Sequence, residues 1–181
     1  MSYIYIVPIK LKDYSCLKPL KEAISHTLHL NIKICESEID LPSTFDPSRN
    51  QYNSSLILLQ LITNPPKDTL KILGVADVDL CIPILTFVFG EAQLNGVGAV
   101  VSSHRLDNQY YGMPKDDKIL SDRLIKEAIH ELGHTYGLVH CNRPHCVMNA
   151  STYVEDIDQK SKELCPSCLK GIQNKKIFNF F

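Results

Sequence analysis

The chain alternates between two spacings of hydrophobic residues, one typical of strands and one typical of helices. Residues 3–9 (YIYIVPI) are rich in strand-forming side chains, and residues 31–35 alternate between apolar and polar positions. Between them, residues 16–30 repeat leucine and isoleucine at helical intervals. The first 35 residues therefore predict a strand, a helix and a second strand.

The middle of the chain continues this mixture. Residues 41–50 have the composition of a loop, and residues 51–63 predict a helix that ends at the breaker Asn-Pro-Pro. Three runs of β-branched or aromatic residues, set off by glycines, predict strands at 70–81, 85–90 and 96–103. Because no repeat or linker interrupts the pattern, we expect one domain over residues 1–181, of α/β (or α+β) class, with a mixed sheet and helices.

Residues 116–137 predict the longest helix, with a broad apolar stripe. His130 and His134 are four residues apart, so both imidazoles point to one side of that helix, about 6 Å apart along its axis. A plain core helix with incidental histidines is the alternative interpretation. The spacing favours two ligands of one zinc ion.

A third histidine follows six residues later. If the helix continued to His140, this side chain would lie about 240° round the axis from His134 and about 9 Å further along, out of reach of the ion. Gly137 can end the helix before His140, because glycine readily adopts the left-handed conformation that lets the chain turn back. We therefore expect His140 to be the third ligand.

Glu131 lies beside the first ligand, about 100° round the helix, and is placed to touch a metal-bound water. Three nitrogen ligands leave one tetrahedral position open, which is typical of catalytic zinc. The ion would lower the pKa of that water toward about 7, and Glu131 would take its proton. The pattern predicts hydrolysis of a peptide bond.

Composition and charge narrow the class of protein. The chain is 44% hydrophobic and 22% charged, with a formal net charge of −1, so it has no electrostatic footprint for nucleic acid or an anionic membrane. The first fifteen residues lack the features of a signal peptide, and no apolar run nears the roughly 20 residues of a membrane span. We expect a cytoplasmic monomer, a setting in which clustered cysteines are more often metal ligands or catalytic than disulfides.

The segment HELGHTYGLVH, residues 130–140, matches HExxHxxGxxH, the signature of the metzincin zinc peptidases. Five fixed residues arise by chance in about one window in three million. The chain resembles this clan further in Met148, which looks like the methionine of the turn that forms a hydrophobic floor under the zinc. For Met148 alone, a gap-filling core residue is the alternative.

The cysteines narrow the resemblance to the archaemetzincin family. Members of that family pair the catalytic ion with a second zinc held by four cysteines, which by motif position are Cys141, Cys146, Cys165 and Cys168 here. Independently of the family, a C-x4-C pair followed by a C-x2-C pair supplies enough thiolates for a closed structural site. A redox CxxC motif and a set of unligated buried thiols are the alternatives.

The resemblance implies a metzincin-like fold with an upper part at residues 1–137 and a small zinc-stapled lower part at 138–181, with the cleft between them. It also implies a zinc metallopeptidase that acts on peptides or proteins and holds two zinc ions, one catalytic and one structural. A non-catalytic protein that binds a peptide or a partner with the same two ions is the second hypothesis. The intact Glu131 favours the enzyme.

Several other residues carry weaker predictions. The strand around residues 99–101 resembles the metzincin edge strand that pairs with an extended peptide. Tyr153 is either a packed tyrosine or an oxyanion stabiliser. The remaining histidines and cysteines are expected to be surface or core residues without a ligand role: His26, His29 and His145, and Cys16, Cys35 and Cys81.

Overall fold

The computed structural model describes residues 2–178, with side chains through residue 175. Its centre is a five-stranded sheet with the order β2-β1-β5-β8-β7. Four strands are parallel and β7 is antiparallel to its neighbour β8. The bounds are β1 (Tyr3–Ile9), β2 (Ile32–Ile34), β5 (Thr69–Ala76), β7 (Gly90–Ala92) and β8 (Gly98–Ser102).

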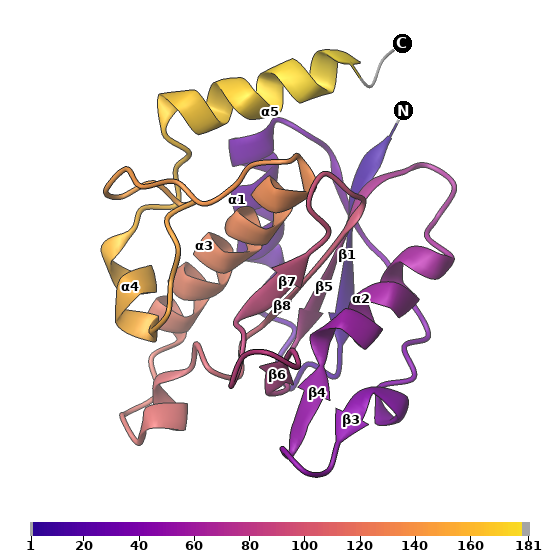
Figure 1. Cartoon of the computed structure of the whole chain (residues 1–181), viewed down its shortest axis with the longest axis vertical. Helices are drawn as coiled ribbons and strands as arrows, with labels where there is room; N and C mark the ends of the chain where they lie inside the picture. The colour runs from indigo at the N-terminus through magenta and orange to yellow at the C-terminus, as the bar shows by residue number, and fades with distance from the viewer. Residues whose placement is uncertain (1, 179–181) are drawn as a thin grey trace.

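Helices cover both faces of this sheet (Figure 1). On β1, Ile4 and Ile6 pack against one face together with α1 (Leu17–Leu28) and α3 (Asp117–Thr135). Tyr5 and Val7 belong to the other face, with α2 (Ser54–Thr63). Successive side chains of a strand project to opposite sides, so a strand covered on both faces reads as a continuous apolar run. The expected α/β architecture is confirmed.

A second, smaller sheet lies beyond one end of the first and has the order β3-β4-β6. Arg49 holds the loop that follows it, because its guanidinium donates to the carbonyls of Ile82, Leu85 and Thr86 at 3.0, 2.5 and 2.8 Å. The short elements here and further on are β3 (Phe45–Asp46), β4 (Gln51–Asn53), β6 (Leu80–Cys81) and the 3₁₀ turns η1 (Pro42–Thr44) and η2 (Asn108–Tyr111).

Three predicted strands need correction. The run 70–81 forms two strands, β5 and β6, because the chain bends between them, where the Ser102 hydroxyl bonds both the N–H and the carbonyl of Val78. The run 85–90 is mostly irregular. The carbonyls of Leu85 and Thr86 accept hydrogen bonds from Arg49 instead of from a neighbouring strand, and within the run 85–89 only Val88 forms a β-bridge, to Leu80. The strand around 99–101 is not an edge strand, because β7 pairs along it.

The chain after Gly137 adds α4 (Val154–Gln159) and α5 (Pro166–Phe178), and the latter lies across the end of the molecule (Figure 1). Met148, Ile157 and Ile172 join the same hydrophobic cluster as the apolar side chains of α3. The division into an upper part and a lower part at residue 137 stays a prediction. Within the described part of the chain, no helix has the length and apolar character needed to cross a membrane.

Candidate metal centres

Helix α3 carries the first two candidate ligands, and both of its ends are defined by local chemistry. Asp116 caps its start, where one carboxylate oxygen accepts from the backbone N–H groups of Lys118 and Ile119 at 3.0 Å each. At the other end, Gly137 has a φ of 80° and its N–H donates to the carbonyl of His134 at 2.8 Å. The helix therefore stops just after its second histidine and the chain turns back, as the sequence predicts.

The two histidines of α3 face each other. Their Nε2 atoms are 3.0 Å apart, while Nδ1 of His130 lies 2.9 Å from the carbonyl of Val147. Nδ1 of His134 lies 2.7 Å from the carbonyl of Leu138. Each carbonyl fixes the proton on Nδ1, so each neutral ring points its Nε2 lone pair toward the other.

The turn at Gly137 brings His140 to the same place. Its ring centroid lies 5.3 Å from that of His130 and 5.1 Å from that of His134. One ligand atom from each of the three rings falls within 4.8 Å of the other two. The three histidines therefore meet, although one is exposed and separated from the others by the end of the helix.

This arrangement fits a divalent zinc ion. Zn–N bonds of about 2.0–2.1 Å place the nitrogens of a tetrahedral site roughly 3.3 Å apart, close to the separation of the two facing Nε2 atoms. Burial lowers the pKa of His130 well below its ordinary value, and the charge of Lys160 lowers it further. Burial also lowers the pKa of His134. Both rings are thus neutral near pH 7, and their opposed lone pairs repel unless a cation lies between them.

Glu131 is almost fully buried, with 6% of its surface exposed. Burial raises the pKa of its carboxyl group well above the ordinary value, and the nearby charges of Glu127 and Glu91 raise it further. Strand β7 passes directly over this side chain, because a Cβ on Gly90 would lie 2.8 Å from Glu131 Oε1. The site combines three imidazole rings that could bind a metal ion with a carboxyl group that holds a proton more readily than usual.

Met148 packs against helix α3 beside the candidate metal site. It is fully buried and so close to Gly133 that a Cβ on that glycine would collide with its sulfur. Its carbonyl accepts from the N–H of Cys141 at 2.8 Å, which links the methionine to the residue after His140. Its burial fits the core-residue interpretation as well, so the role of Met148 as a hydrophobic floor under a zinc ion stays a prediction.

The sequence analysis missed a buried ion pair beside the site. Lys160, which directly follows α4, lies 2.8 Å from the carboxylate of Glu127 and also donates to the carbonyl of Asn149 at 3.1 Å. Glu127 lies one helical turn before Glu131, so its spacing was a signal that could have been noticed. The sequence around Lys160 contains no such signal, because the partners of Lys160 are distant in the chain and no local pattern indicates such a contact.

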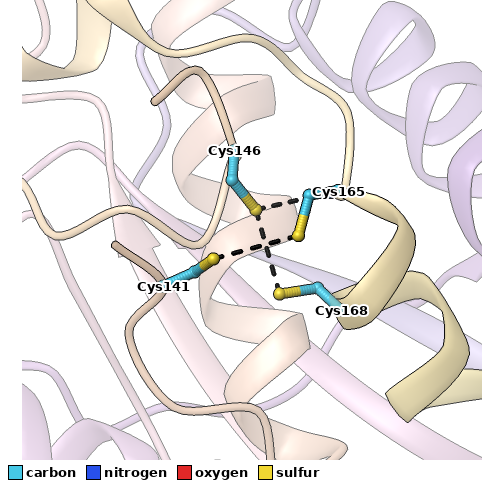
Figure 2. A group of neighbouring side chains, drawn as sticks. All are labelled: Cys141, Cys146, Cys165 and Cys168. Atoms are coloured by element: carbon cyan, nitrogen blue, oxygen red, sulfur yellow. Dashed lines mark hydrogen bonds between the residues drawn. The ribbon is translucent and has the colours of Figure 1, made fainter. Parts of the chain in front are cut away.

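The four predicted cysteines form a second cluster, in which their side chains point toward one another (Figure 2). Cys165 and Cys168 come from the start of α5, and Cys141 and Cys146 from the loops after Gly137. The Sγ atoms of Cys141 and Cys165 are 3.8 Å apart, and those of Cys146 and Cys168 are 3.9 Å apart. A disulfide needs about 2.0 Å, whereas four sulfurs at about 2.3 Å from a tetrahedral zinc lie roughly 3.8 Å from each other.

The protonation of this cluster also fits a cation. Burial raises the pKa of the Cys146 and Cys168 thiols. A hydrogen bond from the backbone N–H of Cys168 lowers the pKa of Cys165 to about 7. Buried thiols of this kind become thiolates together only when a metal ion balances their charge. The donor set therefore matches a closed zinc site better than a redox pair, which would leave two of the four sulfurs unexplained.

The weaker candidates lie outside both clusters. His145 contacts the carbonyl of Gln159 through Nδ1 at 2.9 Å, and His26 and His29 are exposed, as predicted. Tyr153 is 65% exposed at the start of α4, and its role at an oxyanion stays a prediction. The cysteines expected in the core are Cys81, which is buried, and Cys16 and Cys35, which are half-buried.

Comparison with known proteins identifies the group to which these features belong. Residues 27–174 match the family model described as peptidase family M54. An archaemetzincin of Methanocaldococcus jannaschii is 39% identical over 97% of this chain and 95% of its own length. The crystal structure of archaemetzincin from Methanopyrus kandleri is 29% identical, with a TM-score of 0.86, over 97% of this chain and 96% of that one. A zinc-dependent peptidase from Methanocorpusculum labreanum is 33% identical, with a TM-score of 0.84, over 93% of this chain and 99% of that one.

Proposed function

The chain belongs to peptidase family M54 and is a zinc metalloprotease, and we propose that Glu131 is its general base while His130, His134 and His140 hold its catalytic zinc. The meeting of these three rings beside a buried carboxyl group is the observation that carries the proposal. Hydrolysis of a peptide bond is the reaction for which such a set of side chains is suited.

Each side chain has a defined task in this reaction. When bound, zinc supplies a Lewis acid and lowers the pKa of a coordinated water toward about 7. Glu131 accepts the proton of the attacking water and later donates it to the leaving amine nitrogen, so the carboxyl group ends the cycle as it began. The raised pKa of Glu131 supports this double role, because a carboxylate that binds a proton more tightly than usual is a stronger base toward the attacking water.

We propose that the substrate binds as an extended strand along β7. This strand is the edge of the five-stranded sheet and lies against Glu131 at Gly90. Backbone pairing at such an edge gives affinity with little dependence on the side chains of the peptide. It replaces the expectation that residues 99–101 pair with the substrate, because β7 occupies that side of β8.

We also propose a second, structural zinc at Cys141, Cys146, Cys165 and Cys168. The two sulfur separations near 3.8 Å support a tetrahedral ion there. Cys141 directly follows His140, so an ion at this place would restrain the turn that presents the third histidine.

The test of the proposed chemistry is Glu131→Gln, which keeps the shape of the side chain and removes its ability to take a proton. We expect peptide hydrolysis to fall by about 10²- to 10⁴-fold, with an unchanged zinc content by elemental analysis. The matched control is Glu155→Gln, at an exposed position of α4, which should keep full activity. Equal turnover by wild type and Glu131→Gln would rule out the general base.

A further inference from the structure

A cavity of about 690 Å³ lies at the C-terminal end of α3, apart from the three histidines. Residues of β5, of the turn that joins β7 and β8, and of α5 form its walls. The polar residues among those that line it include Lys71, Asn95, Asn174 and Lys175. The described residues around this cavity thus supply two ammonium groups and two amides but no carboxylate.

Lys71 is a buried charge without a counter-ion. Only 7% of its surface is exposed, and its Nζ donates to the carbonyls of Gly96 and Thr135 at 2.6 and 2.8 Å. Among the side chains described, no carboxylate forms an ion pair with it. Burial and, to a smaller extent, the charge of Lys175 together lower its pKa to about 8. Buried charges are normally paired with an opposite charge, and this ammonium group has only the two backbone carbonyls.

Tyr136 gives a second, independent indication of a binding site at this cavity. It lines the same cavity, is 2% exposed, and its ring centroid is 4.5 Å from Lys71 Nζ. Its hydroxyl is buried and has no hydrogen-bond partner among the described residues. The large majority of buried hydroxyl groups in proteins have one. Lys71, whose ammonium has no counter-ion among the described residues, and Tyr136, whose buried hydroxyl group has no partner among them, therefore line one cavity side by side.

We propose that this cavity binds an oxyanion, a phosphate or a carboxylate group, through the ammonium of Lys71, the hydroxyl of Tyr136 and the ammonium of Lys175. Lys175 lies at the open rim and already donates to Asn95 Oδ1 at 3.1 Å, which leaves the Asn95 amide N–H groups for the anion. The volume is within the range of small-molecule sites, so the anion is either free or carried by a larger molecule. The binding site does not depend on the peptidase chemistry.

The experiment is calorimetric titration of the full-length, zinc-loaded protein at constant ionic strength. One arm uses inorganic phosphate, and the other compares a short peptide that ends in a free carboxylate with the same peptide ended by an amide. Tyr136→Phe removes only the hydroxyl group and Lys175→Gln only the rim charge, so neither should impair folding. Lys118→Gln, an exposed lysine at the opposite end of α3, is the matched control.

We expect Tyr136→Phe to weaken anion binding about tenfold, as does the loss of a hydrogen bond to a charged group, and Lys175→Gln to weaken it severalfold, with no change in the control. Binding of phosphate assigns the cavity to a free anion, and binding of the carboxylate peptide alone assigns it to a substrate or peptide terminus. An affinity that is the same in Tyr136→Phe as in wild type would place the anion on the zinc instead and overturn the proposal. Absence of binding in both arms would also overturn it.

Discussion

At the scale of single residues, some positions beside Glu131 have no space for a larger side chain. Gly90 is an example, because a Cβ there would lie 2.7 Å from Glu131 Cγ and from the carbonyl oxygen of Val100. The glycine thus lets the edge strand pass close to the carboxyl group of Glu131, the proposed general base. A side chain at this position must move either the strand or the carboxyl group.

We predict that Gly90→Ala lowers peptide hydrolysis on the order of 10²-fold, because displacement of a catalytic group by about 1 Å has that effect. Steady-state kinetics measures it, and circular dichroism checks that the fold is kept. Gly112→Ala is the control, since no atom of the described residues lies within 4 Å of a Cβ placed there, and its φ of 74° makes the change costly in backbone strain alone. If both variants lost activity equally, strain rather than the contact with Glu131 would be the cause.

Lys71 gives a prediction about pH. Its pKa in the folded protein is about 8, below the ordinary 10.5 that it has when unfolded. Between these two values the unfolded chain keeps a proton that the folded chain has released, so the free energy of unfolding rises with pH over this interval. Below about pH 8 both states are protonated and the burial of the charge opposes folding in full.

Urea unfolding of wild type and Lys71→Met between pH 7.5 and 10.5 measures this effect. We expect the free energy of unfolding of wild type to rise more steeply with pH than that of the variant, because all other titrating groups are common to both. Parallel curves would mean that Lys71 has an ordinary pKa in the folded protein.

At the scale of elements, the end of α3 decides where His140 lies, and so whether it joins His130 and His134. Gly137 has a φ of 80°, in the left-handed region that side chains other than glycine and asparagine avoid. This reversal is what carries the chain from the helix to His140. Lys71 also holds the carbonyl of Thr135, the last residue of α3, so the end of the helix is fixed from two sides.

We predict that Gly137→Ala costs about 1–2 kcal/mol of folding free energy and weakens zinc binding at the histidine site, because the strained turn moves His140. Gly137→Asn should be milder in both respects, since asparagine tolerates this conformation better. Competition with a chromophoric chelator measures the zinc affinity. An alanine variant with wild-type affinity would show that the turn is not needed to present the third ligand.

At the scale of the whole molecule, the chain after α3 is tied to the rest by contacts distant in sequence. The four cysteines join loops and a helix separated by about twenty residues, and Lys160 reaches back to Glu127 of α3. Helix α5 begins at this cluster and also lines the cavity beside the end of α3. The proposed structural zinc would therefore stabilise the segment that carries both the turn at His140 and Met148.

We predict that Cys165→Ser with Cys168→Ser reduces the zinc content from two ions per chain to one or fewer, lowers the unfolding temperature and weakens the remaining site. Elemental analysis, thermal unfolding and peptide hydrolysis measure these three effects. The control is Cys16→Ser, which changes a half-buried cysteine outside the cluster. Normal turnover with one tightly held zinc in the double variant would contradict the coupling between the two sites.

The sequence by itself determined the features that depend on neighbours along the chain. Helical spacing places His130 and His134 on one side of α3, the glycine after them predicts the turn, and two cysteine pairs predict a four-sulfur group. Runs of strand-forming residues also predict the segments that form the parallel strands β1, β2, β5 and β8. These signals are local, because a helix turn or a strand imposes its period on residues a few positions apart.

Only the tertiary structure decided which strand forms the edge of the sheet, and so which strand lies open beside Glu131. It also decided that Lys160 pairs with Glu127, and that Lys71 and Tyr136 share a cavity whose described lining residues include no carboxylate. The physical reason is the same in each case. These contacts join residues far apart in the chain, and no period or local propensity of a single sequence records which distant segments will meet.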